Sequence, residues 1–242
     1  MTRVFRLEWT LHEPMLFVSR EFGSLYQTEP LIGHYAQSYA LGLAQSTYRL
    51  DRSIGVGPRY ADDLGPLAEQ GVYLTPARPT GRVRLRFERF NALGEGLRSR
   101  MDQGAVVDDL DVLLSGRSGR PVNRPQQGVW QLVERGSRFE SFLICDCSAT
   151  PPAVVPWARL GKTLAKAAVS VAESPEVTHD HGTFASAAFL AATDLPDDLE
   201  PLTYELVSIP PAPILRDAKL QGAFLGTSFG ALPASLSFRF DP

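Results

Sequence analysis

The residues best suited to metal or acid–base chemistry form a short triplet, His179-Asp180-His181. Two imidazoles separated by one residue can share a metal ion on an extended backbone, but a zinc site needs a third and a fourth ligand. The only other candidates nearby are generic acids, and proline and glycine residues flank the triplet. We therefore expect a surface loop at this triplet and no bound metal.

The glycine and cysteine patterns do not point to catalysis either. Gly222, Gly226 and Gly230 lack the GK[ST] that completes a P-loop, and the sequence has no GxSxG elbow, HExxH helix or Rossmann fingerprint. Cys145 and Cys147 read as neighbouring same-face positions of a strand, whereas a structural zinc site needs a second pair. These patterns predict a protein without a cofactor.

Two further histidines are candidates for acid–base cleavage of RNA. His12 and His34 could serve in such a reaction if a tyrosine or a lysine lay beside them. On the helix expected around it, His34 falls opposite Ile32 and Tyr39, which favours a structural histidine. We therefore expect no enzymatic activity.

Charge is segregated along a chain whose overall balance is not basic. With 24 Lys and Arg against 27 Asp and Glu, the net charge is −3, so bulk electrostatics gives no support to nucleic-acid binding. From Arg78 to Arg138, however, 12 arginines face 7 acids, and from Glu173 to Glu200 there are 7 acids and no Lys or Arg. The first region could hold phosphate while the second faces solvent or a basic partner protein.

The composition fits one ordinary globular domain over residues 1–242, with 44% hydrophobic and 21% charged residues. The apolar stretches are far shorter than a membrane span, and the N-terminus resembles a strand rather than a signal peptide. Two cysteines are too few for a secreted disulfide framework. We expect a cytoplasmic protein without a membrane partner.

Alternating hydrophobicity predicts most of the strands. In residues 5–11 and again in residues 82–88, apolar side chains alternate with polar ones, as expected for strands that bury one face. We expect Val83, Leu85 and Phe87 to face a core and the intervening arginines to face outward. Further strands are expected near residues 72–74, 129–133, 139–145 and 236–240.

Two main helices are expected. Thr28-Glu29-Pro30 has the form of a helix start, and an apolar stripe from Ile32 to Leu43 follows it. A second helix is expected from Trp157 to Val171, because its apolar residues fall within a narrow arc. Arg159, Lys162 and Lys166 would then form a basic outer face of this second helix.

Residues 91–128 are predicted to form a long irregular insertion. Glycine, proline and asparagine are too frequent around residues 116–125 for a core element, which favours a loop or the tip of a hairpin. Arg117, Arg120 and Arg124 would be free to meet a phosphate backbone there. Taken together, the elements predict an α+β fold with an antiparallel sheet, two main helices and a long inserted hairpin or loop, which fits a ferredoxin-like core.

Three stretches of the sequence resemble one known family. They are Leu16–Glu29 with its continuation to Gly42, the segment from Trp157 to Ala167, and the ending from Leu206 to Gly222. In order and spacing they are similar to the first member of the Csc family, the Cas-five-like subunit of type I-D CRISPR effectors. The match covers about a third of the chain but spans nearly its whole length.

This resemblance implies a modified ferredoxin-like (RRM/RAMP) fold and a non-catalytic role. Such a subunit binds the 5′ handle of the guide RNA, caps the backbone filament and touches the large subunit near the DNA motif that flanks the target. Its partners would be the guide RNA, the backbone and large subunits, and potentially the target DNA. The insertion at residues 91–128 would be a thumb-like hairpin.

The resemblance, together with the charges near the glycines and in the insertion, gives a set of RNA-binding candidates. Physically, such a site needs cations for phosphates and aromatic rings for unstacked bases. Two alternatives stay open, namely an endonuclease that processes repeat RNA on the same fold and an unrelated small-molecule enzyme. The candidates are Arg20, Tyr26, Arg159, Lys162, Lys166, Arg216, Lys219, Arg117, Arg120 and Arg124.

Overall fold

A computed structural model describes residues 2–47, 58–91, 127–146 and 151–240. Its central sheet is antiparallel, with the strand order β4-β8-β1-β10-β9 and β5 paired to β8. Strand β1 (Arg3–Leu11) lies in the middle and pairs with β8 (Arg138–Cys145) on one side and with β10 (Ala165–Glu173) on the other. The shorter strands are β4 (Val72–Leu74), β5 (Arg78–Pro79) and β9 (Trp157–Leu160).

The alternation that predicted β1 is confirmed. Phe5, Leu7, Trp9 and Leu11 are all buried, because side chains two residues apart lie on the same face of a strand. The indole Nε1 of Trp9 donates a hydrogen bond to Ser141 Oγ of β8 at 3.0 Å, so the one polar atom of this buried ring is satisfied.

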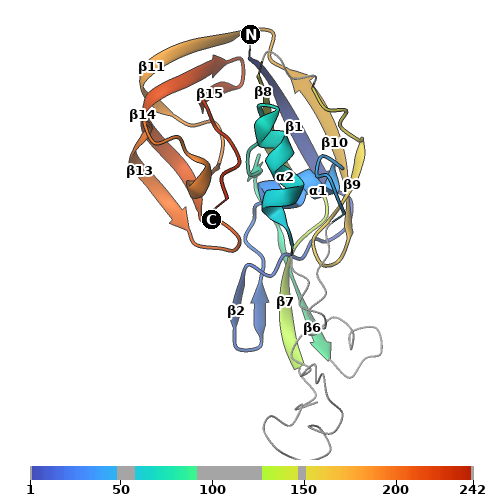
Figure 1. Ribbon diagram of the computed structural model, residues 1–242. Coiled ribbons are helices and arrows are strands. Elements are labelled where there is room, and N and C mark those ends of the chain that lie inside the picture. The colour runs from blue at the N-terminus through green and yellow to red at the C-terminus, as the bar shows by residue number, and fades with distance from the viewer. Residues whose placement is uncertain (1, 48–57, 92–126, 147–150, 241–242) are drawn as a thin grey trace, which may run out of the picture.

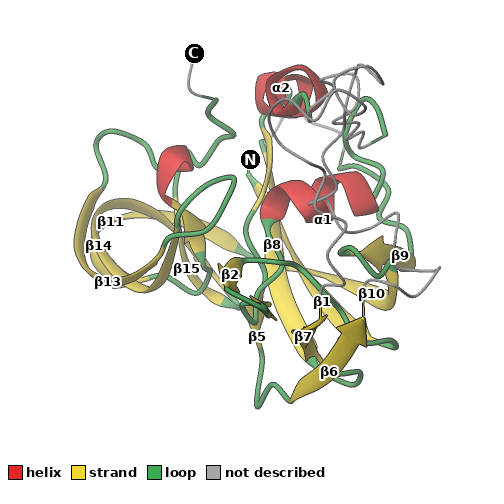
Figure 2. Cartoon of the chain, turned by 90° about the horizontal axis from the view of Figure 1, so that it is seen from below, coloured by secondary structure: helices red, strands yellow, loops and turns green. Residues whose placement is uncertain are grey.

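Two helices, α1 (His34–Ala40) and α2 (Tyr60–Glu69), lie on the same side of the central sheet (Figures 1 and 2). The helix expected to start at Thr28 begins six residues later, since Thr28 instead accepts a hydrogen bond from the Phe17 amide at 3.2 Å. Helix α2 was not expected, because glycines and prolines surround it in the sequence. Asp62 and Asp63 in its first turn favour the helix start electrostatically.

The expected second helix from Trp157 to Val171 is wrong. This segment is the hairpin of β9 and β10, in which Ala158, Leu160, Ala165 and Ala167 are buried at alternate positions. The apolar residues fit a period of two as well as a period of 3.6, and Gly161 in the turn has a φ of 68°, which breaks a helix.

A second sheet is built around the long strand β14 (Ile214–Thr227). Strands β11 (Val177–Ala185) and β12 (Leu190–Ala191) pair along one side of it, and β13 (Glu200–Val207) and β15 (Gly230–Pro233) pair along the other. The sheet curls beside the central sheet (Figure 2). His179-Asp180-His181 lies within β11 rather than in a loop, and the expected strand at 236–240 is an extended segment without strand pairing that buries Leu236 and Phe238.

Four strands form a ribbon that projects away from both sheets (Figure 1). Its order is β2-β3-β7-β6, with β2 at Arg20–Phe22, β3 at Leu25–Gln27, β7 at Gln127–Val133 and β6 at Leu85–Asn91. Leu85 and Phe87 are 43% and 62% exposed, so the expectation that they face a core is wrong. Their strand belongs to a projecting ribbon, and no second layer covers this part of its face within the described residues.

Two α-helices lie in the described residues, although only the first of them was expected. The α+β class and the antiparallel sheet are confirmed. The ferredoxin-like pattern is not confirmed. In a βαββαβ unit each helix belongs to a different half of the unit, whereas both described helices here precede β4. The central and C-terminal sheets share one hydrophobic core, which includes Leu7 of β1 and Leu220 of β14. Of the insertion expected at residues 91–128, positions 92–126 lie outside the described residues.

Candidate nucleic-acid interface

The hairpin of β9 and β10 carries cations on its outer face. Arg159 lies directly across from Lys166 in the antiparallel register, so their side chains point to the same side of the hairpin. The inner face buries Ala158 and Leu160 in the core. The basic residues predicted here therefore do come together, although a strand pair presents them and not a helix.

Trp157 adds an exposed aromatic ring to this face. It lies two residues before Arg159 and is 47% exposed. The Lys166 ammonium lies 4.0 Å from the centroid of the indole ring, and the His12 ring meets it edge-on with 5.0 Å between centroids. A half-exposed indole beside cations is suited to stacking an unpaired base while the cations bind the neighbouring phosphates.

The hairpin turn fixes Lys162 beside the loop that follows β1. The Lys162 amide donates a hydrogen bond to Leu16 O at 2.8 Å, and Thr163 Oγ1 donates to Pro14 O at 3.1 Å. Gly161 approaches this loop so closely that a Cβ there would lie 2.5 Å from Leu16 O. Only glycine allows this approach, since its φ of 68° is also unfavourable for other residues.

Glu13 is the anionic partner of the hairpin face. Its Oε2 lies 2.9 Å from Nη1 of Arg159 and accepts a hydrogen bond from the Lys166 amide at 2.8 Å. The Arg159 and Glu13 side chains are 60% and 49% exposed, so this ion pair is worth at most about 1 kcal/mol. A phosphate can therefore replace the carboxylate at low cost. We call His12, Trp157, Arg159, Lys162 and Lys166 the hairpin patch.

The projecting ribbon offers a second exposed surface with aromatic and basic side chains. Phe22 and Arg89 lie in one row across the four strands, and Phe87 lies two residues before Arg89 on the same face. Phe22 is 57% exposed and Phe87 is 62% exposed. The base of the ribbon adjoins the hairpin patch, because Met15 next to Leu16 pairs with Val133 of β7.

Tyr26, one of the predicted site residues, lies on the opposite face of the ribbon. Its ring packs against Phe90 with 5.6 Å between centroids, and Phe90 stacks on Trp130 at 4.8 Å. Burial, with a smaller contribution from Glu21, raises the pKa of the Tyr26 phenol. This tyrosine is therefore a neutral member of an aromatic cluster.

Two other predicted residues meet at one buried carboxylate. Glu29 is 7% exposed, and its oxygens lie 3.2 Å from Nη1 of Arg20 and 2.8 Å from Nη2 of Arg216. This bridge connects β2 of the ribbon with β14 of the C-terminal sheet. Nε of Arg216 is buried and has no hydrogen-bond partner among the described residues, and the guanidinium lies 5.5 Å from the Phe189 ring. Nη1 of Arg216 also lies 3.8 Å from Glu205, so two carboxylates face these two cations.

The remaining predicted residues are not part of these clusters. Lys219 is exposed on β14, across from Ala185 and Thr203, and within the described ranges no contact links it to the hairpin patch. Arg117, Arg120 and Arg124 lie outside the described residues.

Sequence reasoning missed the roles of Glu13 and Glu29 and the contact of His12 with Trp157, and it placed Trp157 on a buried stripe. The missing information is tertiary, because His12 and Trp157 become neighbours only when β1 pairs with β10. The sequence did carry a local signal for Trp157. If residues 157–160 form a strand, Ala158 and Leu160 lie on one face and Trp157 lies on the other, so burial of the first two predicts that Trp157 is exposed.

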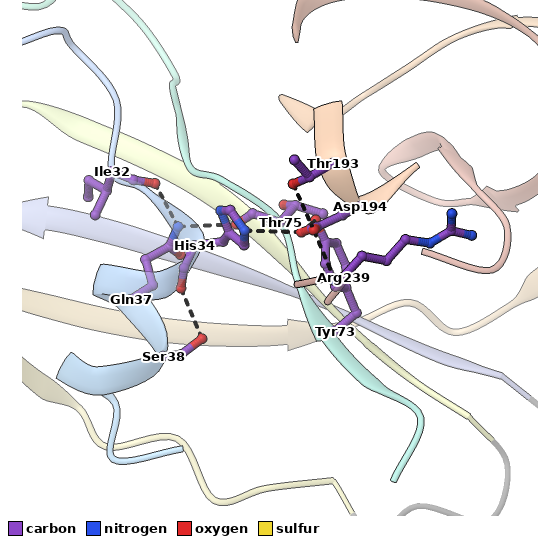
Figure 3. A network of polar contacts seen from close by, with 9 residues as sticks. All are labelled: Ile32, His34, Gln37, Ser38, Tyr73, Thr75, Thr193, Asp194 and Arg239. Atoms are coloured by element: carbon purple, nitrogen blue, oxygen red, sulfur yellow. Dashed lines mark hydrogen bonds and ion pairs between the residues drawn. The ribbon is translucent and has the colours of Figure 1, made fainter. Parts of the chain in front are cut away.

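A polar network around Asp194 connects helix α1, β4 and the C-terminal part of the chain (Figure 3). Asp194 ends the 3-10 turn η2 (Ala192–Asp194), and its Oδ2 accepts a hydrogen bond from the Tyr73 hydroxyl at 2.9 Å and lies 3.0 Å from Nε2 of His34. The latter contact is close but not aligned as a linear hydrogen bond. His34, Tyr73 and Asp194 are 2%, 1% and 0% exposed, so this network joins helix α1 to the C-terminal sheet and cannot reach an RNA phosphate.

A cavity of about 390 Å³ lies between the helices and the C-terminal segment. Its lining includes Tyr35, Arg59 and Arg239. Arg59 pairs with Asp62, and Arg239 pairs with Asp197 at 2.6 Å, so neither guanidinium is available for a phosphate without breaking an ion pair. The cavity is therefore a weaker candidate for an anion than the hairpin patch.

Metal-binding and thiol chemistry find no support in the described part of the chain. No group of three or more His, Cys, Asp or Glu side chains there is placed to hold a metal ion. Cys145 is fully buried, and burial raises the pKa of its thiol to about 11, so it is not a reactive thiolate. Cys147, its expected neighbour, lies outside the described residues.

Comparison with known proteins decides the family. The family model described as type I-D CRISPR-associated protein Cas5/Csc1 matches residues 2–241. The chain belongs to this family. As a Cas5/Csc1 member it is a Cas5-like subunit of the type I-D CRISPR system and has its partners within a CRISPR effector complex.

Other comparisons add little to this Cas5/Csc1 assignment. The crystal structure of a CRISPR protein from Archaeoglobus fulgidus is similar over 96% of this chain and 97% of that chain, at 12% identity and a TM-score of 0.43. No curated protein matches the chain. Neither helix described for this family member is long and apolar enough to cross a membrane.

Proposed function

We propose that this Cas5/Csc1 subunit binds the 5′ handle of the guide RNA without cleaving it. In this role it caps the backbone filament next to the large subunit and contributes to recognition of the DNA motif that flanks the target. The hairpin patch is the observation that carries the proposal. It combines an exposed indole with cations from both strands of one hairpin, which are the groups that single-stranded RNA requires.

The balance of charges supports binding at a local patch and not over the whole surface. The chain as a whole carries a net charge of −3, so long-range attraction to RNA is weak. Among the described residues, Glu13 is the acid in contact with the patch, through an ion pair with Arg159 and a hydrogen bond from the Lys166 amide. Base stacking on an aromatic ring is worth about 1–3 kcal/mol, which makes Trp157 the strongest single contributor expected there.

The positions of the histidines support a non-catalytic role. Cleavage of RNA through a 2′-hydroxyl needs an imidazole that reaches the scissile phosphate. His34 is buried against Asp194 and Tyr73 and cannot reach it. His12 is exposed, however, and shares the indole of Trp157 with Lys166. This arrangement favours one second candidate, a repeat-RNA endonuclease that uses His12 and Lys166.

Co-expression with the other subunits of the effector complex and a CRISPR array tests the proposal. The complex is purified through a tag on another subunit, and its guide RNA is quantified by length. We expect the variant carrying Trp157→Ala and Lys166→Gln to lose most of the guide RNA, or to join RNA-containing complexes far less often than the unaltered subunit. Unchanged RNA content and unchanged incorporation would contradict the proposal.

A cleavage assay separates the two candidates. Labelled repeat RNA is incubated with the purified subunit and with a His12→Ala variant. We expect intact RNA in both reactions. Cutting at one site that disappears in the His12→Ala variant would establish the endonuclease instead.

A further inference from the structure

Strand β13 leaves one edge of the C-terminal sheet open. Among the described residues β13 pairs only with β14, and it lies at the outer border of the sheet, away from the helices (Figure 1). Every residue from Glu200 to Leu206 is exposed, whichever face its side chain occupies. A strand that is open at its edge and on both faces presents backbone donors and acceptors to any chain that can pair with it.

The second half of β13 also exposes apolar side chains. Tyr204 and Leu206 lie on the same face and are 50% and 54% exposed, and Leu202 just before them is 44% exposed. The register with β14 is regular from Glu205 to Val207. Apolar side chains repeated along one open strand differ from the scattered exposed residues found on most surfaces, and they mark a site of interaction.

The features of the strand that discourage pairing all lie before Glu205. Pro201 has no N–H to offer, and the register shifts on either side of Thr203 disturb the ladder. The segment from Tyr204 to Val207 carries neither a proline nor a lysine. The part of the edge that is open to pairing is therefore Glu205–Val207, which displays Leu206 and follows directly after Tyr204.

The charges around β13 define the chemistry of its partner. Asp198 and Glu200 are exposed, and no Lys or Arg of the described residues pairs with either of them. Glu205 is 63% exposed and lies 3.8 Å from Arg216, a long contact. Arg216, opposite Glu205, and Lys219, opposite Thr203, are the cations of β14 that face this strand. This acidic rim repels a nucleic acid, and it also repels a second copy of β13, because like charges would then lie opposite each other.

We propose that the open edge of β13 accepts an extended segment of a partner protein that alternates apolar residues with lysine or arginine. The segment adds a strand beside residues 204–207, its apolar side chains cover Tyr204 and Leu206, and its cations face the acidic rim. This mode of recognition takes affinity from backbone hydrogen bonds and specificity from alternate side chains. The proposal does not rest on RNA binding, since β13 lies on a different sheet from the hairpin patch.

The test uses the full chain without RNA and a labelled, end-blocked ten-residue peptide that alternates valine and lysine. We expect this peptide to bind and to slow amide hydrogen exchange in residues 203–207. A peptide that alternates valine and glutamate should bind at least tenfold more weakly. A chain with Tyr204→Lys and Leu206→Lys should also lose at least tenfold in affinity, whereas Val155→Lys, at an exposed apolar residue elsewhere, should bind as the unaltered chain does.

Three results would overturn this inference. The first is equal binding of the two peptides. The second is unchanged hydrogen exchange in β13 when the valine–lysine peptide is bound. The third is self-association of the chain that is abolished by Leu206→Lys. Because no RNA is present, each of these results leaves the proposed function intact. Loss of guide RNA from the Trp157 and Lys166 variant, conversely, bears only on the proposed function.

Discussion

His34 Nε2 lies 3.0 Å from Asp194 Oδ2, and both side chains are almost completely buried. The first belongs to helix α1 and the second to the 3-10 turn of the C-terminal half, so this contact holds together parts of the chain that are 160 residues apart in the sequence numbering. Asp194 Oδ1 also accepts a hydrogen bond from the Arg239 amide at 3.2 Å. Burial, reinforced by the Asp194 carboxylate, raises the pKa of Tyr73 well above its ordinary value, so the phenol remains a donor.

Replacing Asp194 with alanine is expected to destabilise the fold by ~1–3 kcal/mol, because it leaves the Tyr73 hydroxyl buried without its acceptor. Urea unfolding of the purified chain measures this loss. Asp197→Ala is the matched control, since Asp197 is 95% exposed and its pair with Arg239 is a surface ion pair. We expect a change below about 1 kcal/mol for the control. Equal losses of stability in the two variants would show that the buried network contributes no more to the fold than the surface ion pair does.

The close approach of Gly161 to Leu16 predicts a graded effect of alanine. Gly161→Ala introduces a Cβ that would lie 2.5 Å from a backbone oxygen, in addition to the strain of a φ of 68°. Gly136→Ala is the control, because Gly136 has a similar φ of 78° but open space around its Cα. We expect about 1–2 kcal/mol of destabilisation from backbone strain in both variants and a clearly larger loss for Gly161→Ala. Guide-RNA retention should fall only in the Gly161 variant, because only that turn positions Lys162.

The carboxylate of Asp63 predicts part of the acid sensitivity of the protein. Hydrogen bonds from the Tyr39 hydroxyl at 2.6 Å and from Ser46 Oγ at 2.7 Å lower the pKa of Asp63. A pKa that is lower in the folded state than in the unfolded state stabilises the fold above the unfolded value of about 3.9, and this stabilisation is lost as the pH falls through the folded value. Asp63→Asn should therefore reduce stability at pH 7 and flatten the decline of stability below about pH 4. An unchanged pH profile measured by chemical unfolding would show that these hydrogen bonds do not favour the ionised form.

Much of the fold could be predicted from local patterns. Strand β1 alternates from Phe5 to Leu11 with large apolar side chains, and this signal is strong because one face packs against the core. The hairpin of β9 and β10 shows the limit of such patterns. Its alanines and leucines fit both a helix and a strand, and the choice is made by pairing with β1, which lies far away in the sequence.

The candidate site was predictable in its residue types but not in its geometry. The cations Arg159, Lys162 and Lys166 were identified from the sequence, and pairing across the hairpin places Arg159 opposite Lys166. The ion pairs of Arg20 and Arg216 with Glu29 depend on contact between the ribbon and the C-terminal sheet, which no local pattern reports. The exposure of Phe87 was also not predicted. Alternation shows that a strand has an apolar face, but it does not show whether another part of the protein covers that face.

Photo-crosslinking is the most direct test of the central claim that the hairpin patch contacts the guide RNA. The complex is assembled on guide RNA that carries 4-thiouridine only in its 5′ handle, irradiated, digested and analysed by mass spectrometry. We expect crosslinked peptides from residues 157–166. The yield should fall at least tenfold with Trp157→Ala but not with Arg3→Gln, which removes a cation ~26 Å away at the other end of β1. Crosslinks confined to other parts of the chain, with the same yield in the Trp157→Ala variant, would contradict the claim.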